Sequence, residues 1–192
     1  HLYGPSAKDF SVVEVPQMNF LMIDGQGDPN TATEYVQSLE ALYPVAFKIK
    51  FMSKKSLARD YAVPPLEGLW WADDMDDFVA RRKERWRWTM MIMQPDWITP
   101  EMFDEALVLV EKSKNPAALS KLRFAAYDEG QSVQILHVGS YDDEGPVLAR
   151  MHDEFIPQNG FAMNGKHHEI YLSDPRKMAP EKLQTVLRQP VV

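Results

Sequence analysis

Polar and apolar side chains alternate with a period of two along residues 166–172, which read KHHEIYL. Because successive side chains of a strand point to opposite faces, this pattern predicts a strand with two different faces. One face carries His167, Glu169 and Tyr171, and the other carries His168, Ile170 and Leu172. The second face is mainly apolar, so the first face is the one expected to do chemistry.

Similar patterns predict the remaining elements along the chain. Runs of β-forming residues indicate strands at 12–23, 66–71, 86–94, 122–126, 132–139 and 186–192. Pro16 is expected to mark an edge or a bulge in the first strand, residues 122–139 read as a hairpin, and 186–192 reads as a last edge strand. Apolar residues at helical spacing predict three helices. The first begins after Asp28 or Asn30 as its N-cap and ends at about residue 53, and the others cover 100–114 and 141–155. Pro44 should bend the first helix, and Thr99 and Pro100 should start the second.

The two halves of the chain repeat one order of elements: a strand, a glycine-containing turn, a helix, a strand with a glutamate and a closing strand. Residues 20–28 align with 134–142, and Glu67 aligns with Glu169. This predicts an α+β fold of two pseudo-symmetric β-α-β-β repeats, about 11–95 and 120–192, whose antiparallel sheets surround a central ligand cleft. Both glutamates are expected to face that cleft. Residues 1–10, which begin with His1, are expected to be a leader without functional weight.

Tryptophans are concentrated in one predicted hairpin, at positions 70, 71, 86 and 88. Core packing explains most aromatic stripes of this kind, but an aromatic-walled pocket is the alternative. The second interpretation predicts that at least two of Trp70, Trp71 and Trp88 line the cleft.

Composition excludes several classes of function. With 21 basic and 28 acidic residues and a net charge of −7, the 192-residue chain lacks the positive surface that nucleic acid needs. The absence of cysteine rules out thiolate chemistry and suits a reducing cytoplasm, and no apolar run is long enough to span a membrane. The turn at 24–30 lacks the third glycine of a phosphate-binding fingerprint, and the aspartates at 73–77 lack the spacing of a calcium loop.

Five stretches together resemble the GyrI-like small-molecule-binding family over about residues 12–192: 65–70 (PLEGLW), 93–97 (MQPDW), 136–143 (LHVGSYDD), 168–176 (HEIYLSDPR) and 179–183 (APEKL). The resemblance implies a duplicated α+β fold with a hydrophobic cleft and a buried glutamate, which maps onto Glu169. The branch that this chain resembles includes proteins that hydrolyse the cyclopropane ring of cyclopropanoid DNA-alkylating antibiotics. Trp71 and residues 86–88 are bulkier than the family pattern at these positions.

Three hypotheses follow for the site. In an enzyme, Glu169 would activate water as a general base and Tyr171, about 7 Å away along the backbone, would donate a hydrogen bond to the substrate. In a binding module without chemistry, Glu169 would pair with flat cations and the tryptophans would stack on them. A metal enzyme would use His167 and Glu169 with His152 or His168, but His168 faces away.

The predicted site therefore has Glu169 and Tyr171 as catalytic residues, with Glu67, Trp70, Trp71, Trp88, Tyr141 and His167 as ligand-binding residues. Tyr141 follows Gly139 at the end of a strand and is expected near the mouth of the cleft. We expect a hydrophobic or aromatic small molecule as ligand, with no cofactor, metal or nucleic acid.

Overall fold

A computed structural model describes residues 1–74, 77 and 80–192. Asp76, one of the aspartates at 73–77, lies outside the described residues. The chain divides into two compact units. The first unit comprises His1–Gln17, Leu66–Leu69 and Asp128–Val192, and the second comprises Met18–Pro65 and Trp70–Tyr127. Both are built from antiparallel strands and helices, so the predicted α+β class is confirmed. The internal duplication and its boundaries stay a prediction.

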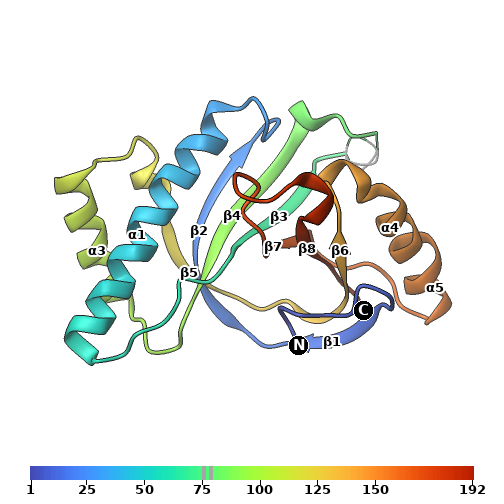
Figure 1. The fold of residues 1–192 in the computed structure, drawn as a ribbon, viewed down its shortest axis with the longest axis horizontal. Helices are drawn as coiled ribbons and strands as arrows, with labels where there is room; N and C mark the ends of the chain where they lie inside the picture. Colours follow the sequence, from blue (N-terminus) through green and yellow to red (C-terminus); the bar gives the residue numbers. More distant parts are fainter. Residues whose placement is uncertain (75–76, 78–79) are drawn as a thin grey trace. The chain divides into compact units, whose positions relative to one another are not determined.

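In the first unit the strands follow the order β1, β6, β8, β7 and the first half of β3. Their bounds are Ser11–Val15 for β1, Leu66–Ala72 for β3, Gly130–Val138 for β6, His167–Tyr171 for β7 and Gln184–Pro190 for β8. β8 pairs with both β6 and β7, so the prediction of a last edge strand is wrong (Figure 1). The side chains of Val186 and Leu187 point to opposite faces and are both buried, so β8 is covered on both faces.

One face of β6 and β8 is covered by a helical segment whose type of turn changes along its length. It consists of the turn η3 (Tyr141–Asp143), α4 (Gly145–Ala149), the π-helical turn η4 (Arg150–Phe155) and α5 (Ile156–Gln158), and Figure 1 shows α4 and α5 on one side of β6. The helix predicted for 141–155 is present, but it begins at Gly145 after a 3₁₀ turn, contains a π-helical turn and runs on to Gln158. Met151 packs in the core with Ile135 and Leu187, and Val147 and Phe155 pack against that core.

In the second unit the order is the second half of β3, then β4 (Trp86–Gln94), β2 (Met18–Gln26) and β5 (Arg123–Tyr127). The predicted strand 12–23 divides after Val15, because Pro16 has no N–H to continue a ladder. The predicted hairpin of β5 and β6 is also wrong. β5 pairs with β2, whereas β6 pairs with β1 and β8.

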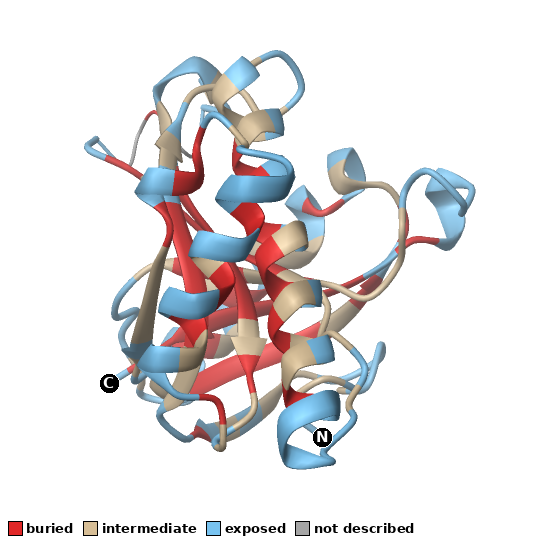
Figure 2. Cartoon of the chain, turned by 90° about the vertical axis from the view of Figure 1, so that its left-hand side faces the viewer, coloured by how far each residue is buried: buried red, intermediate tan, exposed pale blue. Residues whose placement is uncertain are grey.

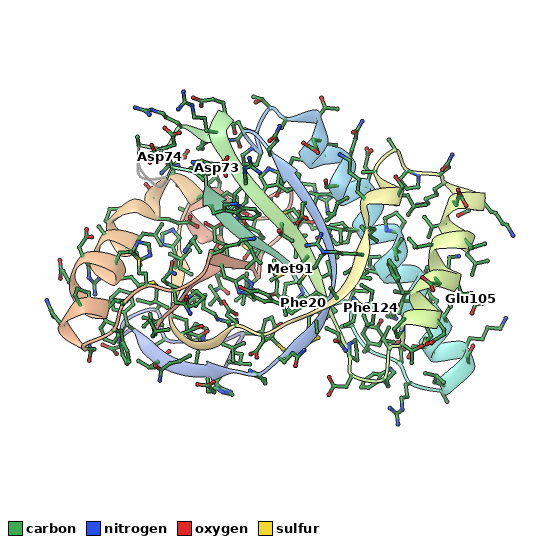
Figure 3. The ribbon with its side chains drawn as sticks, turned by 180° about the vertical axis from the view of Figure 1, so that it is seen from behind. Phe20, Asp73, Asp74, Met91, Glu105 and Phe124 are labelled. Carbon is green, nitrogen blue, oxygen red and sulfur yellow. The ribbon has the colours of Figure 1, made fainter. Side chains whose placement is uncertain are left out.

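Two helices lie against the strands of the second unit, α1 (Thr33–Leu57) and α3 (Pro100–Ser113). Figure 2 shows exposed residues on the outer side of the helices that face the viewer and buried residues where they meet the strands. Thr99 caps α3, since its Oγ1 accepts from the backbone N–H of Met102 at 3.4 Å. The ring of Phe124, which lies near Phe20 in Figure 3, stacks on Phe103 with 6.0 Å between centroids.

The start of α1 differs from the prediction. Ala32, which has no side-chain acceptor, stands at the N-cap, and Asp28 instead closes a local turn by accepting from the N–H of Asn30 at 2.9 Å. Pro44 lies inside the helix between the buried Leu42 and Val45, so packing of this face holds the helix together past the missing donor.

Short 3₁₀ turns complete the described structure: η1 (Lys83–Arg85), η2 (Leu119–Lys121) and η5 (Pro180–Lys182). Within the described residues, no helix combines the length and apolar character needed to cross a membrane.

Candidate functional site

Glu169 lies on β7 with two side chains from the same face of that strand. The hydroxyl of Tyr171 donates to Oε2 of Glu169 at 2.6 Å, and Nε2 of His167 lies 3.3 Å from Oε1. The alternation predicted from the sequence therefore brings these three residues together. The Glu169 side chain keeps 14% of its surface exposed, so this carboxylate remains accessible from outside the unit.

Tyr141 extends this group of side chains. Its ring meets that of Tyr171 edge to face, with 5.7 Å between centroids. Burial raises the pKa of Tyr141 to about 12, and the nearby carboxylates of Glu144, Glu169 and Asp174 add to the rise. The phenol is therefore protonated at neutral pH and can donate a hydrogen bond. Whether it binds a ligand stays a prediction.

The turn that brings Tyr141 into place depends on Gly139. This residue has φ 149°, and a Cβ here would lie 3.1 Å from Nε2 of His137. That ring nitrogen lies 3.0 Å from the carbonyl oxygen of Ser140 and holds the turn. His137 is thus a packed residue.

His152 approaches the group from the helical side. Its ring faces that of His167 with 6.2 Å between centroids, from the π-helical turn η4. Burial lowers the pKa of His152 to about 4, and His167 contributes to the decrease. The imidazole is therefore neutral at physiological pH. π-helical turns of this kind occur frequently at functional sites.

The opposite face of β7 carries a buried network of charged residues that the sequence did not reveal. Nε2 of His168 lies 2.8 Å from Oε2 of Glu67, and Nδ1 lies 2.9 Å from Oε1 of Glu129. Arg188 on β8, which is paired with His168, donates to Oε2 of Glu129 at 3.1 Å and to Oε1 of Gln134 at 3.0 Å. We call Glu67, Glu129, His168 and Arg188 the buried network.

Burial alone would lower the pKa of His168, but the carboxylates of Glu129 and Glu67 outweigh it and raise the pKa to about 9. Burial likewise favours the neutral form of Glu129, but His168 and Arg188 outweigh it and lower its pKa. The His168 imidazolium donates from Nε2 to Glu67 and from Nδ1 to Glu129. The positive charges of His168 and Arg188 thus balance the two carboxylates.

The prediction that Glu67 and Glu169 face the same site is wrong. Glu67 bonds to His168, whose side chain lies on the opposite face of β7 from Glu169. The face predicted to be apolar is apolar at Ile170 but polar at His168, where Glu67, Glu129 and Arg188 approach from other segments. The one local signal for this network was Arg188, a charge inside the apolar run at 186–192.

Two residues of the predicted leader at 1–10, Leu2 and Tyr3, contact the same network. The hydroxyl of Tyr3 donates to Oε1 of Glu67 at 2.8 Å, and Arg188 donates to the carbonyl oxygen of Leu2 at 2.7 Å. Burial raises the pKa of Tyr3 further above its ordinary value, and the Glu67 carboxylate adds to the rise. The Tyr3 phenol is therefore neutral and can donate a hydrogen bond at neutral and moderately alkaline pH.

The tryptophans belong to the second unit and differ in role. Trp88 is 0% exposed, its Nε1 donates to the carbonyl oxygen of Gly27 at 3.3 Å, and its ring meets that of Tyr35 edge to face. It is a core residue and presents no surface to a ligand. Trp70 is buried against Trp86, with 5.8 Å between ring centroids, and Trp71 is half-buried. Binding by Trp70 and Trp71 stays a prediction.

Among residues 1–74, 77 and 80–192, no group of three histidine, aspartate or glutamate side chains is placed to hold a metal ion.

Comparison with known proteins now adds to this geometry. A family model for the GyrI-like small-molecule-binding domain matches residues 8–192. The chain belongs to this family. The GyrI-like resemblance inferred from its motifs is thereby confirmed, and small-molecule binding is the property that the family model describes. No curated protein matches the sequence.

Solved structures agree with the assignment. An uncharacterized conserved protein from Listeria innocua is 40% identical, with a TM-score of 0.88 over 99% of this chain and 95% of that chain. A hydrolase from Listeria innocua is also 40% identical, with a TM-score of 0.84 over 99% and 94%. The C-terminal domain of EcmrR is 12% identical, with a TM-score of 0.61 over 96% and 97%, and shares the fold.

Proposed function

We propose that this GyrI-like protein hydrolyses flat aromatic small molecules that contain a strained, electrophilic ring, with Glu169 as the general base. The observation that carries the proposal is the accessibility of Glu169 compared with the two carboxylates of the buried network. The side chains of Glu67 and Glu129 are 0% and 1% exposed and are bonded to His168, whereas Glu169 is 14% exposed. Of the three glutamates around β7, Glu169 is therefore the one that a water and a substrate could reach together.

The geometry suits a base that is held in place. Tyr171 bonds to Oε2 of Glu169 and so restricts rotation of the carboxylate, while Oε1 points toward His167. A carboxylate oriented through one oxygen can accept a proton from water at the other. Tyr171 here donates to Glu169 and not to a substrate, so its first role in this proposal is to position the base.

A cyclopropane conjugated to a dienone is the substrate class implied by the family resemblance, and hydrolysis would protect a cell from such an alkylating agent. Water would attack a ring carbon, the new C–O bond would form as a C–C bond of the cyclopropane breaks, and the electron pair would move through the conjugated system to the carbonyl oxygen. Glu169 would take the proton of the water, and the carbonyl oxygen would become a protonated phenol, so the net change is addition of one water. Tyr141, which is protonated and lies next to Tyr171, would donate a hydrogen bond to that oxygen.

Two observations support the proposal from outside the site. The hydrolase from Listeria innocua is 40% identical over nearly the whole chain, and the family model describes small-molecule binding. Binding without chemistry is the second candidate function, and the same family model favours it.

The test compares Glu169→Gln with the parent on a neutral cyclopropanoid, following ring-opened product by mass spectrometry. Glutamine keeps the shape but cannot accept the proton, so turnover should fall by about 10²- to 10⁴-fold while the affinity changes little. Glu154→Gln, a change at an exposed glutamate on η4, is the matched control and should keep parental turnover.

Two outcomes would reject catalysis by Glu169. Product that stops at one equivalent of protein would identify a binding module, and cationic ligands should then bind Glu169→Gln about 2 to 5 kcal/mol more weakly. Parental turnover by a folded Glu169→Gln protein would show that another group is the base.

A further inference from the structure

Residues 1–3 bind to polar side chains of the first unit in the way a ligand would, through Glu67, Gln134 and Arg188. The phenol of Tyr3 donates to Oε1 of Glu67 at 2.8 Å, and two backbone carbonyl oxygens accept from side chains of the strands. The carbonyl oxygen of Leu2 accepts from Nη2 of Arg188 at 2.7 Å, and that of His1 accepts from Nε2 of Gln134 at 3.0 Å. One aromatic hydroxyl and two amide carbonyls are thus recognised together.

The groups that receive this segment are organised independently of it. Oε2 of Glu67 is held by His168, and Arg188 is held by Glu129 and Gln134. The acceptor for the phenol and the donor for the carbonyl are therefore fixed by contacts within the sheet. A molecule that replaced residues 1–3 would meet a preorganised pair of polar groups.

Each charge of the network has a cost of burial that its partners must offset. Taking charged side chains out of water costs several kcal/mol for each ion, and well-packed apolar residues often do equally well or better. The side chains of Glu67, Glu129, His168 and Arg188 are at most 1% exposed. Oε1 of Glu67 and Nη2 of Arg188, the two groups that face residues 1–3, belong to side chains oriented by other partners.

The charge of the network defines the kind of ligand that fits. The imidazolium of His168 and the guanidinium of Arg188 balance the carboxylates of Glu67 and Glu129, so an added ion would be left uncompensated. A neutral hydroxyl donor satisfies Oε1 of Glu67 without adding charge. A ligand without that hydroxyl would bury the oxygen unpaired, which is the basis of strong discrimination.

We propose that Glu67 and Arg188 form a binding site for a neutral phenol that carries an amide carbonyl, and that residues 1–3 are its displaceable internal occupant. This site lies on the opposite face of β7 from Glu169, so the proposal does not depend on hydrolysis by Glu169. It assigns Tyr3 the role of a competitor that a ligand must displace. The apparent affinity is then the intrinsic affinity multiplied by the fraction of time the site is free of Tyr3.

The experiment uses N-acetyl-tyrosinamide as the probe and N-acetyl-phenylalaninamide as the matched compound without a hydroxyl. Binding is measured by calorimetry to the parent chain, to Tyr3→Ala and to Tyr3→Phe. NMR of the parent follows the ring signals of Tyr3. Tyr43→Ala, which removes a tyrosine from α1 in the second unit, is the control for loss of a tyrosine side chain.

We expect the probe to bind the parent weakly and to move the Tyr3 ring signals to those of a solvent-exposed tyrosine. Tyr3→Ala should bind the probe at least about tenfold more tightly than the parent, and Tyr3→Phe should fall between them because its ring remains but its hydrogen bond is lost. Tyr43→Ala should match the parent. The phenylalanine compound should bind at least about tenfold more weakly than the probe, and Glu67→Gln should reduce that difference.

Three results would overturn the proposal. The first is absence of probe binding to both the parent and a folded Tyr3→Ala protein. The second is equal binding of the two compounds, which would mean that the hydroxyl is not recognised. The third is binding to Tyr3→Ala while Tyr3 stays in place in the parent up to the solubility limit of the probe, which would make Tyr3 a fixed part of the structure. If Tyr3→Ala does not fold, Tyr3→Phe and the NMR titration of the parent decide the question.

Discussion

Raising the pH from 6.5 to about 9 should remove the stabilisation that the His168 imidazolium gives to the folded chain. The pKa of His168 is raised from its ordinary value of 6.5 to about 9 in the folded state, because Glu129 and Glu67 outweigh the effect of burial. A raised pKa means that the folded chain binds the proton more tightly than the unfolded chain. The contribution is therefore complete below pH 6.5 and lost as the pH rises through about 9.

The magnitude follows from the size of the shift. The difference between 6.5 and about 9 corresponds to about 3 kcal/mol at 1.36 kcal/mol for each pH unit. The side chain is 0% exposed, so solvent screening takes little away. For a chain of this size, about 3 kcal/mol corresponds to a decrease of about 6–12 °C in Tm. Glu129 does not cancel the effect, since a lowered carboxyl pKa affects stability only on acidification.

Urea unfolding at pH 6.5 and pH 9 measures this change directly. The parent should lose about 3 kcal/mol between the two conditions, and His168→Gln should lose little. His137→Gln, which changes another buried histidine of the first unit, is the control and should keep the parental dependence. If removal of one charge prevents folding, the double variant His168→Gln/Glu67→Gln removes one charge of each sign. A His168→Gln protein that loses as much stability as the parent would refute the assignment.

Three further predictions concern single contacts. Tyr171→Phe removes the donor beside the proposed catalytic carboxylate, so kcat should fall by about 10- to 100-fold, measured with the same cyclopropanoid assay. His152→Phe should unfold less readily than the parent as the pH falls from 6.5 to 4. The pKa of His152 is lowered to about 4 in the folded chain, so in this pH range the unfolded parent binds a proton that the folded parent does not. Acid unfolding followed by fluorescence measures this, and equal unfolding midpoints for the two proteins would contradict it. Gly25→Ala places a Cβ against the ring of Trp88 and should destabilise the chain to urea by about 1–3 kcal/mol or more, whereas Gly4→Ala, with no atom within 4 Å of its Cβ, should change little.

The elements that were predicted well are those specified by neighbouring residues. β4 begins and ends where the β-forming run at 86–94 does, and α3 follows the cap and first-turn proline at Thr99 and Pro100. On β7 the alternation alone brought His167, Glu169 and Tyr171 to one face, because the period of a strand is a local property of the backbone.

Strand pairing was predicted poorly, and for a physical reason. The short loop at 128–130 suggested a hairpin, but β5 pairs with β2 and β6 pairs with β1 and β8. A strand presents the same backbone donors and acceptors to any partner, so its choice depends on packing of residues far away in the sequence. The same reason explains why the run at 186–192 became an inner strand.

The sequence by itself determined the family, the α+β class and the face of β7 that carries Glu169. Only the tertiary structure decided what lies behind that face. His168 was predicted to point to an apolar side, yet it is held between Glu67 and Glu129, 101 and 39 positions away, with Arg188 beside them. No local pattern can show such a network, because each charge is tolerated only after folding has brought its partner within hydrogen-bond distance.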